Sequence, residues 1–271
     1  MTNADSLPER LGRDLLALRE RAPLVHNITN FVVMNVTANA LLALGASPIM
    51  AHAVEELDDL LGFASALVLN IGTLDPAWIA SMQQAAALAE AKGVPIVLDP
   101  VGAGASRLRT ATALALLQKG RPAIVRANPS EILALAGAAG VTKGVDSTNT
   151  SGEAEAAART LAQSAGCTVA VSGAVDFITD GTTSWRLSGG SPLMPRITGM
   201  GCTATALVGA FAGICATPLQ AAVAGMAVMK VAAEIAAESA EGPGTQQLYF
   251  LDALHLLTPE DLIRRIRLAR A

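Results

Sequence analysis

Short apolar runs alternate with amphipathic stretches along most of the chain, a pattern typical of strand–helix repeats. The clearest run, residues 66–72, is continuously apolar with turn signals at both ends. This pattern is typical of a strand that is buried on both faces. The predicted strands are residues 24–28, 47–51, 66–72, 95–99, 123–128 and 168–173. The predicted helices are residues 30–44, 76–91 and 152–165, one after residue 51, and one that begins at Pro129.

The pattern changes in the last third of the chain. Residues 176–179 and 183–187 flank Asp180-Gly181, which predicts a hairpin, and the chain from Ile197 onward is mostly helical. The repeats predict an α/β fold, a mostly parallel sheet with helices on both faces and an antiparallel edge near residues 176–188. Residues 147–152 form a polar loop, but the pattern is the same on both sides, so we expect residues 1–271 to be a single domain.

Composition narrows the possible functions. With 52% hydrophobic and 3% aromatic residues, the chain has the apolar surface for a core of Ala, Leu, Val, Ile and Met. A net charge of −4 and the lack of a Lys/Arg block argue against nucleic-acid or membrane-surface partners. The three cysteines form no CxxC motif, and the N-terminus has no signal-peptide pattern, so we expect a reduced, cytoplasmic chain.

One segment is long enough to cross a bilayer, because no charged residue lies between Ile197 and Met229. Glycines open this segment, and Pro218 with its polar neighbours interrupts it. This interruption favours two buried helices joined by a turn over a membrane span.

The predicted strands end in polar or small residues. These are Asn27, Met50, Asn70, Gly72, Asp99, Asn128, Ser172 and Gly173. Because ligands of open parallel sheets bind beyond the carboxyl ends of the strands, this rim is the candidate site, although ordinary loops can have a similar composition.

Three charged residues near the rim each allow a functional interpretation. Asp99 either helps to hold Mg²⁺ or is a turn aspartate bonded to its own backbone. Glu131 either joins the metal site or completes a capping box with Asn128 at a helix start. Arg126, inside an apolar strand, needs a partner, and a phosphate would suit its guanidinium.

The strongest local signal is Gly199-Met200-Gly201-Cys202, which leads into an apolar helix. Glycines let the backbone N–H groups turn inward, and a helix N-terminus adds positive potential, so we predict an anion hole for a phosphoryl group. Cys202 should lie in the first helical turn, where we expect a lowered thiol pKa. The alternative is a tight helix entry with a buried structural cysteine.

Six motifs in order resemble those of the hydroxyethylthiazole kinase family, which is ribokinase-like, over about residues 15 to 260. They are His26-Asn27-Ile28-Thr29-Asn30, Pro48-Ile49-Met50-Ala51, Asn70-Ile71-Gly72-Thr73-Leu74, Asp99-Pro100-Val101-Gly102-Ala103, Asn128-Pro129-Ser130-Glu131 and Thr198-Gly199-Met200-Gly201-Cys202. The cysteine that ends the last motif is informative, since most ribokinase-like kinases have an aspartate base there. Two residues depart from the family's usual pattern, Met200 and Ser172, but only the backbone of the first and the hydroxyl of the second are needed.

The resemblance implies a ribokinase-like three-layer sandwich that phosphorylates 4-methyl-5-(2-hydroxyethyl)thiazole with ATP in thiamine salvage. It also implies a homotrimer with sites between subunits, and roles for particular residues. These are thiazole contacts from Met50, Gly199, Asn27 and Gly72, nucleotide contacts from Arg126 and Ser172, Mg²⁺ held by Asp99 and Glu131, and Cys202 at the attacking hydroxyl.

Three alternatives remain open. The first is a related kinase of another small alcohol, such as a hydroxymethylpyrimidine. The second is an ATP-dependent hydro-lyase, which would normally have an aspartate at the position of Cys202. The third is a non-catalytic sensor of small ligands, which would have no need to keep Asp99, Glu131 and Cys202.

Overall fold

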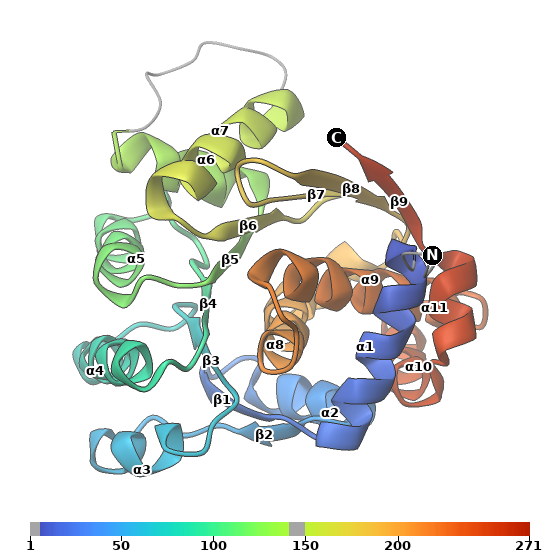
Figure 1. The fold of residues 1–271 in the computed structure, drawn as a ribbon, viewed down its shortest axis with the longest axis horizontal. Helices are drawn as coiled ribbons and strands as arrows, with labels where there is room; N and C mark the ends of the chain where they lie inside the picture. Colours follow the sequence, from blue (N-terminus) through green and yellow to red (C-terminus); the bar gives the residue numbers. More distant parts are fainter. Residues whose placement is uncertain (1–5, 141–149) are drawn as a thin grey trace, which may run out of the picture.

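A computed structural model describes residues 6–140 and 150–271, in which nine strands form one sheet (Figure 1). The strands are β1 (Leu24–Ile28), β2 (Ser47–Ile49), β3 (Ala66–Asn70), β4 (Ile96–Asp99), β5 (Ile124–Ala127), β6 (Thr168–Val171), β7 (Val175–Thr179), β8 (Ser184–Ser188) and β9 (Arg267–Arg270). The helices are α1 (Leu7–Arg21), α2 (Met34–Leu44), α3 (Leu57–Leu61), α4 (Pro76–Lys92), α5 (Arg107–Gly120), α6 (Pro129–Ala138), α7 (Thr150–Ala165), α8 (Met200–Ala212), α9 (Pro218–Ala237), α10 (Pro243–Leu256) and α11 (Pro259–Arg265). Two 3₁₀ turns, η1 (Val54–Glu56) and η2 (Met194–Arg196), complete the elements.

The strand order is β2-β1-β3-β4-β5-β6-β7-β8-β9. The pairs from β2 to β6 are parallel, and those from β6 to β9 are antiparallel. This arrangement confirms the predicted parallel sheet and its antiparallel edge, to which β9 adds a further strand. The part of the predicted polar loop at residues 147–149 lies outside the described residues.

Helices cover both faces of the sheet (Figure 1): α3 to α7 lie on one face, and α8 and α9 lie against the other. Residues of β3 alternate between two apolar cores, with Val68 in the core shared with α8 and α9 and Leu67 and Leu69 in the other. All five residues of β3 are buried, as the apolar run predicts.

The charge-free segment forms two helices, α8 and α9, joined by a turn. The Thr217 side chain accepts a hydrogen bond from the Gln220 N–H, and Pro218 takes the first helical position, so this polar interruption starts a new helix. By length and composition α9 could cross a membrane, but 78% of its apolar window is buried inside the protein. The interpretation of two buried helices is therefore confirmed.

Some predicted boundaries are wrong by a few residues, and three elements were not predicted. Helix α2 begins at Met34, because the Asn30 side chain accepts a hydrogen bond from the Val32 N–H and holds the preceding residues in a turn. Strand β2 ends at Ile49. The unpredicted elements are α1, α5 and β9. Strand β9 pairs with a strand about eighty residues earlier, and such distant pairing leaves no local pattern.

The sheet reverses its direction of winding beside β1. The connection from β1 to β2 runs through α2 on one face, and the connection from β2 to β3 runs through α3 on the other. Open α/β sheets bind ligands at such a switch point, outside the carboxyl ends of the strands. The candidate rim therefore includes the position expected from topology alone.

Candidate active site

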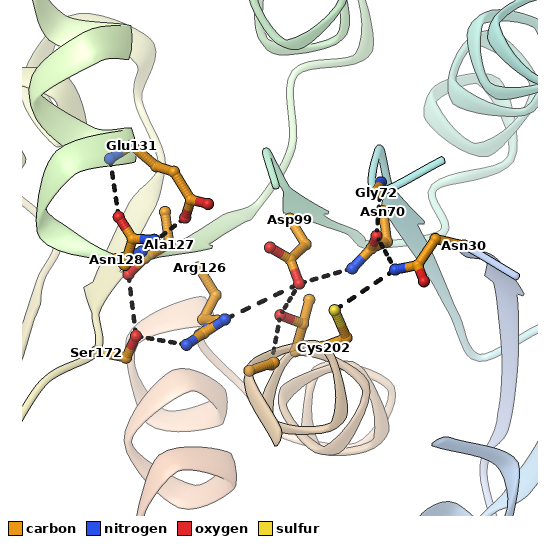
Figure 2. A network of polar contacts seen from close by, with 12 residues as sticks. Asn30, Asn70, Gly72, Asp99, Arg126, Ala127, Asn128, Glu131, Ser172 and Cys202 are labelled. Atoms are coloured by element: carbon orange, nitrogen blue, oxygen red, sulfur yellow. Dashed lines mark hydrogen bonds and ion pairs between the residues drawn. The ribbon is translucent and has the colours of Figure 1, made fainter. Parts of the chain in front are cut away.

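Asp99 lies at the centre of a buried polar network at the carboxyl edge of the sheet (Figure 2). The register places it opposite Asn70 of β3, whose Nδ2 donates to Asp99 Oδ2 at 2.8 Å. Thr205 of α8 donates to the same oxygen at 2.7 Å. The sequence interpretation that Asp99 only caps its own turn is therefore incomplete, since side chains from two other elements hold it.

The ionised form of the Asp99 carboxyl is destabilised by its surroundings. The pKa of its carboxyl is raised to about 6 in all: burial is the largest cause and the Glu131 charge acts in the same direction, whereas Arg126 and the donors Thr205 and Asn70 lower the pKa. The negative charge of Asp99 is thus only partly compensated by its protein neighbours. Such a carboxylate has a strong electrostatic attraction for a cation.

Cys202 lies in the first turn of α8, as predicted, but its thiol is not activated. The pKa of the thiol is raised to about 11 in all: burial is the largest cause and the nearby Asp99 charge acts in the same direction, whereas hydrogen bonds from Asn70 and Asn30 lower the pKa. The expectation of a lowered thiol pKa is therefore wrong, because the desolvation of the thiolate outweighs the helix N-terminus. Asn30 links Cys202 to the Asp99 network, because its Nδ2 lies 3.5 Å from the Cys202 Sγ and 2.8 Å from the Asn70 Oδ1.

Two glycines at the start of α8 allow close approach of its backbone to neighbouring side chains. Gly199 has φ +84°, and a Cβ there would lie 2.8 Å from a methyl group of Val33. A Cβ on Gly201 would lie 2.8 Å from the Arg126 Nη1. The backbone of the first turn can therefore approach the guanidinium closely, and the helix N-terminus adds positive potential at the same place. This geometry agrees with an anion-binding corner.

Arg126 and Ser172 come together beside this corner. The Arg126 Nη2 donates to the Ser172 Oγ, and its Nη1 lies 4.0 Å from the Asp99 Oδ2 (Figure 2). The guanidinium is buried, and its Nε has no hydrogen-bond partner within the described residues. A buried guanidinium with spare donors can bind an anionic oxygen.

Glu131 completes the capping box that the sequence suggests. Its Oε2 accepts from the Asn128 N–H at 2.9 Å, while the Asn128 side chain accepts from the Glu131 N–H at 3.0 Å. Its Oε1 accepts from the Gly102 N–H at 2.8 Å, so the carboxylate also holds the loop after β4. The capping interpretation is confirmed, and a role of Glu131 at a metal stays a prediction.

Asn27, Met50 and Gly72 lie at the other end of the rim, beside β1, β2 and β3. The Asn27 Nδ2 donates to the backbone of Val25, and its buried Oδ1 has no partner within the described residues. The Gly72 carbonyl accepts from Arg109 at 2.8 Å. The strand order therefore separates these residues from Arg126 and Ser172, with Asp99 of β4 between the two groups.

A cavity of about 760 Å³ opens at the Arg126 end of the rim. Six residues singled out from the sequence line it: Arg126, Asn128, Ser172, Gly173, Met200 and Gly201. Its size lies in the range usual for small-molecule sites. Lys230 and Asp176 also line it, and sequence reasoning did not single them out.

The described residues contain no group of three or more His, Cys, Asp or Glu side chains that could hold a metal ion. Mg²⁺ is often bound by one or two carboxylates, with water and substrate phosphates as the remaining ligands. The carboxylates of Asp99 and Glu131 are of the ligand type that Mg²⁺ uses, and their role at a metal stays a prediction.

Comparison with known proteins gives consistent results. The sequence profile of the hydroxyethylthiazole kinase family matches residues 15–260. The chain is 58% identical to a hydroxyethylthiazole kinase of Nitratidesulfovibrio vulgaris over 97% of this chain and 98% of the relative. It is 54% identical to that of Syntrophus aciditrophicus over 96% of this chain and 97% of the relative.

Solved structures agree with these sequence matches. The hydroxyethylthiazole kinase of Pyrococcus horikoshii OT3 superposes with a TM-score of 0.91 at 44% identity, covering 97% of this chain and 99% of that chain. A pyridoxal kinase of Staphylococcus aureus superposes with a TM-score of 0.64 at 17% identity, covering 92% of this chain and 98% of that one. At this low identity the second match concerns the fold alone. Together they confirm the ribokinase-like α/β fold expected from the sequence.

Proposed function

The chain belongs to the hydroxyethylthiazole kinase family, and on that premise we propose that it transfers the γ-phosphoryl group of ATP to the primary hydroxyl of 4-methyl-5-(2-hydroxyethyl)thiazole. The product is the thiazole phosphate used in thiamine salvage and biosynthesis. The observation that carries the catalytic assignment is the position of Cys202 and Asp99 between the two ends of the rim. One end would hold the nucleotide and the other the alcohol, so the reacting groups would meet between them.

The nucleotide belongs at the Arg126 end of the rim. The cavity of about 760 Å³ is large enough for a nucleotide, and Arg126 and Ser172 place polar hydrogens on its wall. Guanidinium and hydroxyl groups bind phosphate oxygens through short charge-assisted hydrogen bonds. The Met200, Gly201 and Cys202 N–H groups of the first turn of α8 complete the anion hole for the migrating phosphoryl group.

The thiazole belongs at the β1–β3 end. Met50 and Gly199 would contact the ring, and Asn27 and Gly72 would line the same pocket. The switch point of the sheet and the unpaired Asn27 Oδ1 support this placement.

This end of the rim also lies at the edge of the sheet, which suggests a subunit contact. Strand β2 is the last strand on that side, and nearby Phe31 and Val32 are 61% and 62% exposed. Large exposed apolar side chains beside a site are typical of interfaces. The family resemblance implies a homotrimer, and we propose one in which a neighbouring subunit covers these side chains and completes the thiazole pocket.

Asp99 and Glu131 would organise Mg²⁺ at the nucleotide phosphates. The Glu131 charge contributes to the raised pKa of Asp99, and a divalent cation would relieve that repulsion. When bound, the ion neutralises charge on the phosphate oxygens.

Cys202 would lie at the attacking hydroxyl. Because the pKa of its thiol is raised to about 11, the group is protonated near neutral pH and is a poor general base. Phosphoryl transfer depends mostly on positioning and charge stabilisation, so a strong base is not required. We expect the amides of the α8 turn to contribute more than the thiol.

The wider assignment is a soluble cytoplasmic enzyme formed by one domain, residues 1–271, without nucleic-acid or membrane partners. The continuous sheet from β2 to β9 and the burial of α9 support it.

The direct test is an ADP-release assay coupled to NADH oxidation. We expect ADP release that requires both hydroxyethylthiazole and Mg²⁺. Faster release with hydroxymethylpyrimidine would favour a kinase of another alcohol. Binding of thiazole and nucleotide without any ADP release would identify a sensor and overturn the proposal.

A further inference from the structure

One buried ion pair lies outside the hydrogen-bond network of Asp99 described above. Lys230 is one of two charged residues in the otherwise apolar helix α9, and it is only 6% exposed. Its ammonium group lies 3.3 Å from the carboxylate of Asp176, which is 1% exposed. Burying two charges is unfavourable unless each also forms hydrogen bonds. The hydrogen-bond partners of Lys230 and Asp176 therefore identify the segments that the pair holds in place.

The partners of Lys230 are backbone carbonyl groups of two separate loops. Its Nζ donates to the carbonyl oxygens of Gly173 at 2.8 Å and Ala174 at 3.0 Å, in the turn between β6 and β7. It also lies 3.4 Å from the carbonyl oxygen of Gly189, at the end of β8. The ammonium therefore connects two loops that have no strand pairing with each other at these residues.

Asp176 holds the same turn from the other side. Its Oδ1 accepts from the Gly173 N–H at 2.8 Å. Both polar atoms of the Gly173 backbone are thus fixed by the pair, the N–H by the carboxylate and the carbonyl by the ammonium. Gly173 directly follows Ser172, whose hydroxyl meets Arg126.

All of these residues line the cavity of about 760 Å³. We propose that Lys230 and Asp176 are a positioning pair for nucleotide binding: they fix the two loops of the cavity wall and thereby hold the Ser172 hydroxyl against Arg126. The proposal rests on the assignment of this cavity to ATP. The pair acts through the loops, so it should set the affinity for nucleotide and leave the alcohol site, at β1 to β3, unaffected.

The two side chains should differ in importance. Lys230→Met leaves Asp176 as a buried, unpaired charge and frees three carbonyl groups, so both loops lose their anchor. Asp176→Asn keeps an oxygen for the Gly173 N–H and leaves the carbonyl contacts of the ammonium in place. The double variant removes the orphaned charge, so its defect should be smaller than the sum of the two single defects.

The experiment measures the KM for ATP, the KM for hydroxyethylthiazole, and the Kd for ADP by calorimetry. We expect Lys230→Met to raise the ATP KM and the ADP Kd about tenfold or more, with the thiazole KM within about twofold of wild type. Asp176→Asn should raise the same two constants about two- to fivefold. The matched control is Lys92→Met, which breaks the Lys92–Asp58 pair on the surface, away from the cavity. It should change neither the ATP KM nor the ADP Kd.

A merely structural pair would lower the melting temperature and the active fraction of enzyme, but the folded fraction would keep its ATP KM and ADP Kd. Unchanged ATP KM and ADP Kd in the folded fraction of either single variant overturn the proposal. If Lys230→Met does not fold, the constants of Asp176→Asn decide the question. If wild type binds ADP but phosphorylates no thiazole, the proposed function fails while the ADP Kd still tests the pair. If wild type binds no nucleotide, both proposals are overturned.

Discussion

Replacing Asp99 by asparagine should make the protein more stable at neutral pH. The carboxyl of Asp99 is buried, and its pKa is raised from 3.8 to about 6. Between these values the folded state binds more protons than the unfolded state, so this group lowers stability as pH rises through the window. Above about pH 6 the buried carboxyl is ionised, and its full destabilising effect is present.

The size of the effect follows from the same values. The difference between about 6 and 3.8 corresponds to about 3 kcal/mol, at about 1.4 kcal/mol per pKa unit. Asparagine imitates the protonated carboxyl, and its Oδ1 can still accept from Thr205 and Asn70, which both donate to one oxygen of Asp99. We therefore expect Asp99→Asn to be up to about 3 kcal/mol more stable than wild type near pH 8, and about equal to it near pH 4.

The assay is urea unfolding followed by circular dichroism, with EDTA present so that no divalent cation compensates the charge. The matched control is Asp58→Asn, because the side chain of Asp58 is 71% exposed. It should change stability by less than about 0.5 kcal/mol at either pH. A variant less stable than wild type near pH 8, or an equal stability difference at both pH values, would refute the reasoning. The Asp99→Asn variant should also lose Mg²⁺-dependent turnover.

Three further substitutions test other parts of the site. Cys202→Ala should lower kcat about 10- to 100-fold with the ATP KM unchanged, at or below the low end of what a general base contributes, because the thiol is protonated near neutral pH. An unchanged kcat in a folded variant would remove Cys202 from catalysis. Gly199→Ala should cost about 1–3 kcal/mol by thermal melting, because φ there is +84°, and should lower kcat about 100-fold. Gly242→Ala, where a Cβ meets nothing within 4 Å, is its control, and equal effects would contradict the strain argument. Glu131→Gln should cost about 1–3 kcal/mol, because both carboxylate oxygens accept backbone N–H groups, and should raise the Mg²⁺ concentration for half-maximal rate. An unmoved Mg²⁺ titration would leave Glu131 as a cap only.

The sequence is informative where local chemistry decides the outcome. Strand β1 has the predicted limits, and β3 is buried on both faces because its apolar run leaves no solvent-facing side. The capping box at Asn128 forms because Pro129 and Glu131 occupy the positions that such a box requires.

The rest depends on contacts between distant segments. The raised pKa of Cys202 comes from its burial depth and from Asp99, about one hundred residues earlier, and neither can be deduced from a helix start. Thr205 reaches Asp99 only because α8 packs over β4. A signal for Lys230 was present, since it is a lone lysine in an apolar segment, but its partners lie in loops that only the antiparallel strands bring to it.

The central claim is that the first turn of α8 presents its backbone amides to the transferred phosphoryl group beside Arg126. A crystal structure with ADP, Mg²⁺, aluminium fluoride and hydroxyethylthiazole tests it most directly. We predict that the aluminium fluoride, which mimics the transferred phosphoryl group, accepts hydrogen bonds from the Gly201 and Cys202 N–H groups, with the diphosphate of ADP at Arg126. A mimic bound against another wall, with the amides of this turn facing away from it, would contradict the account.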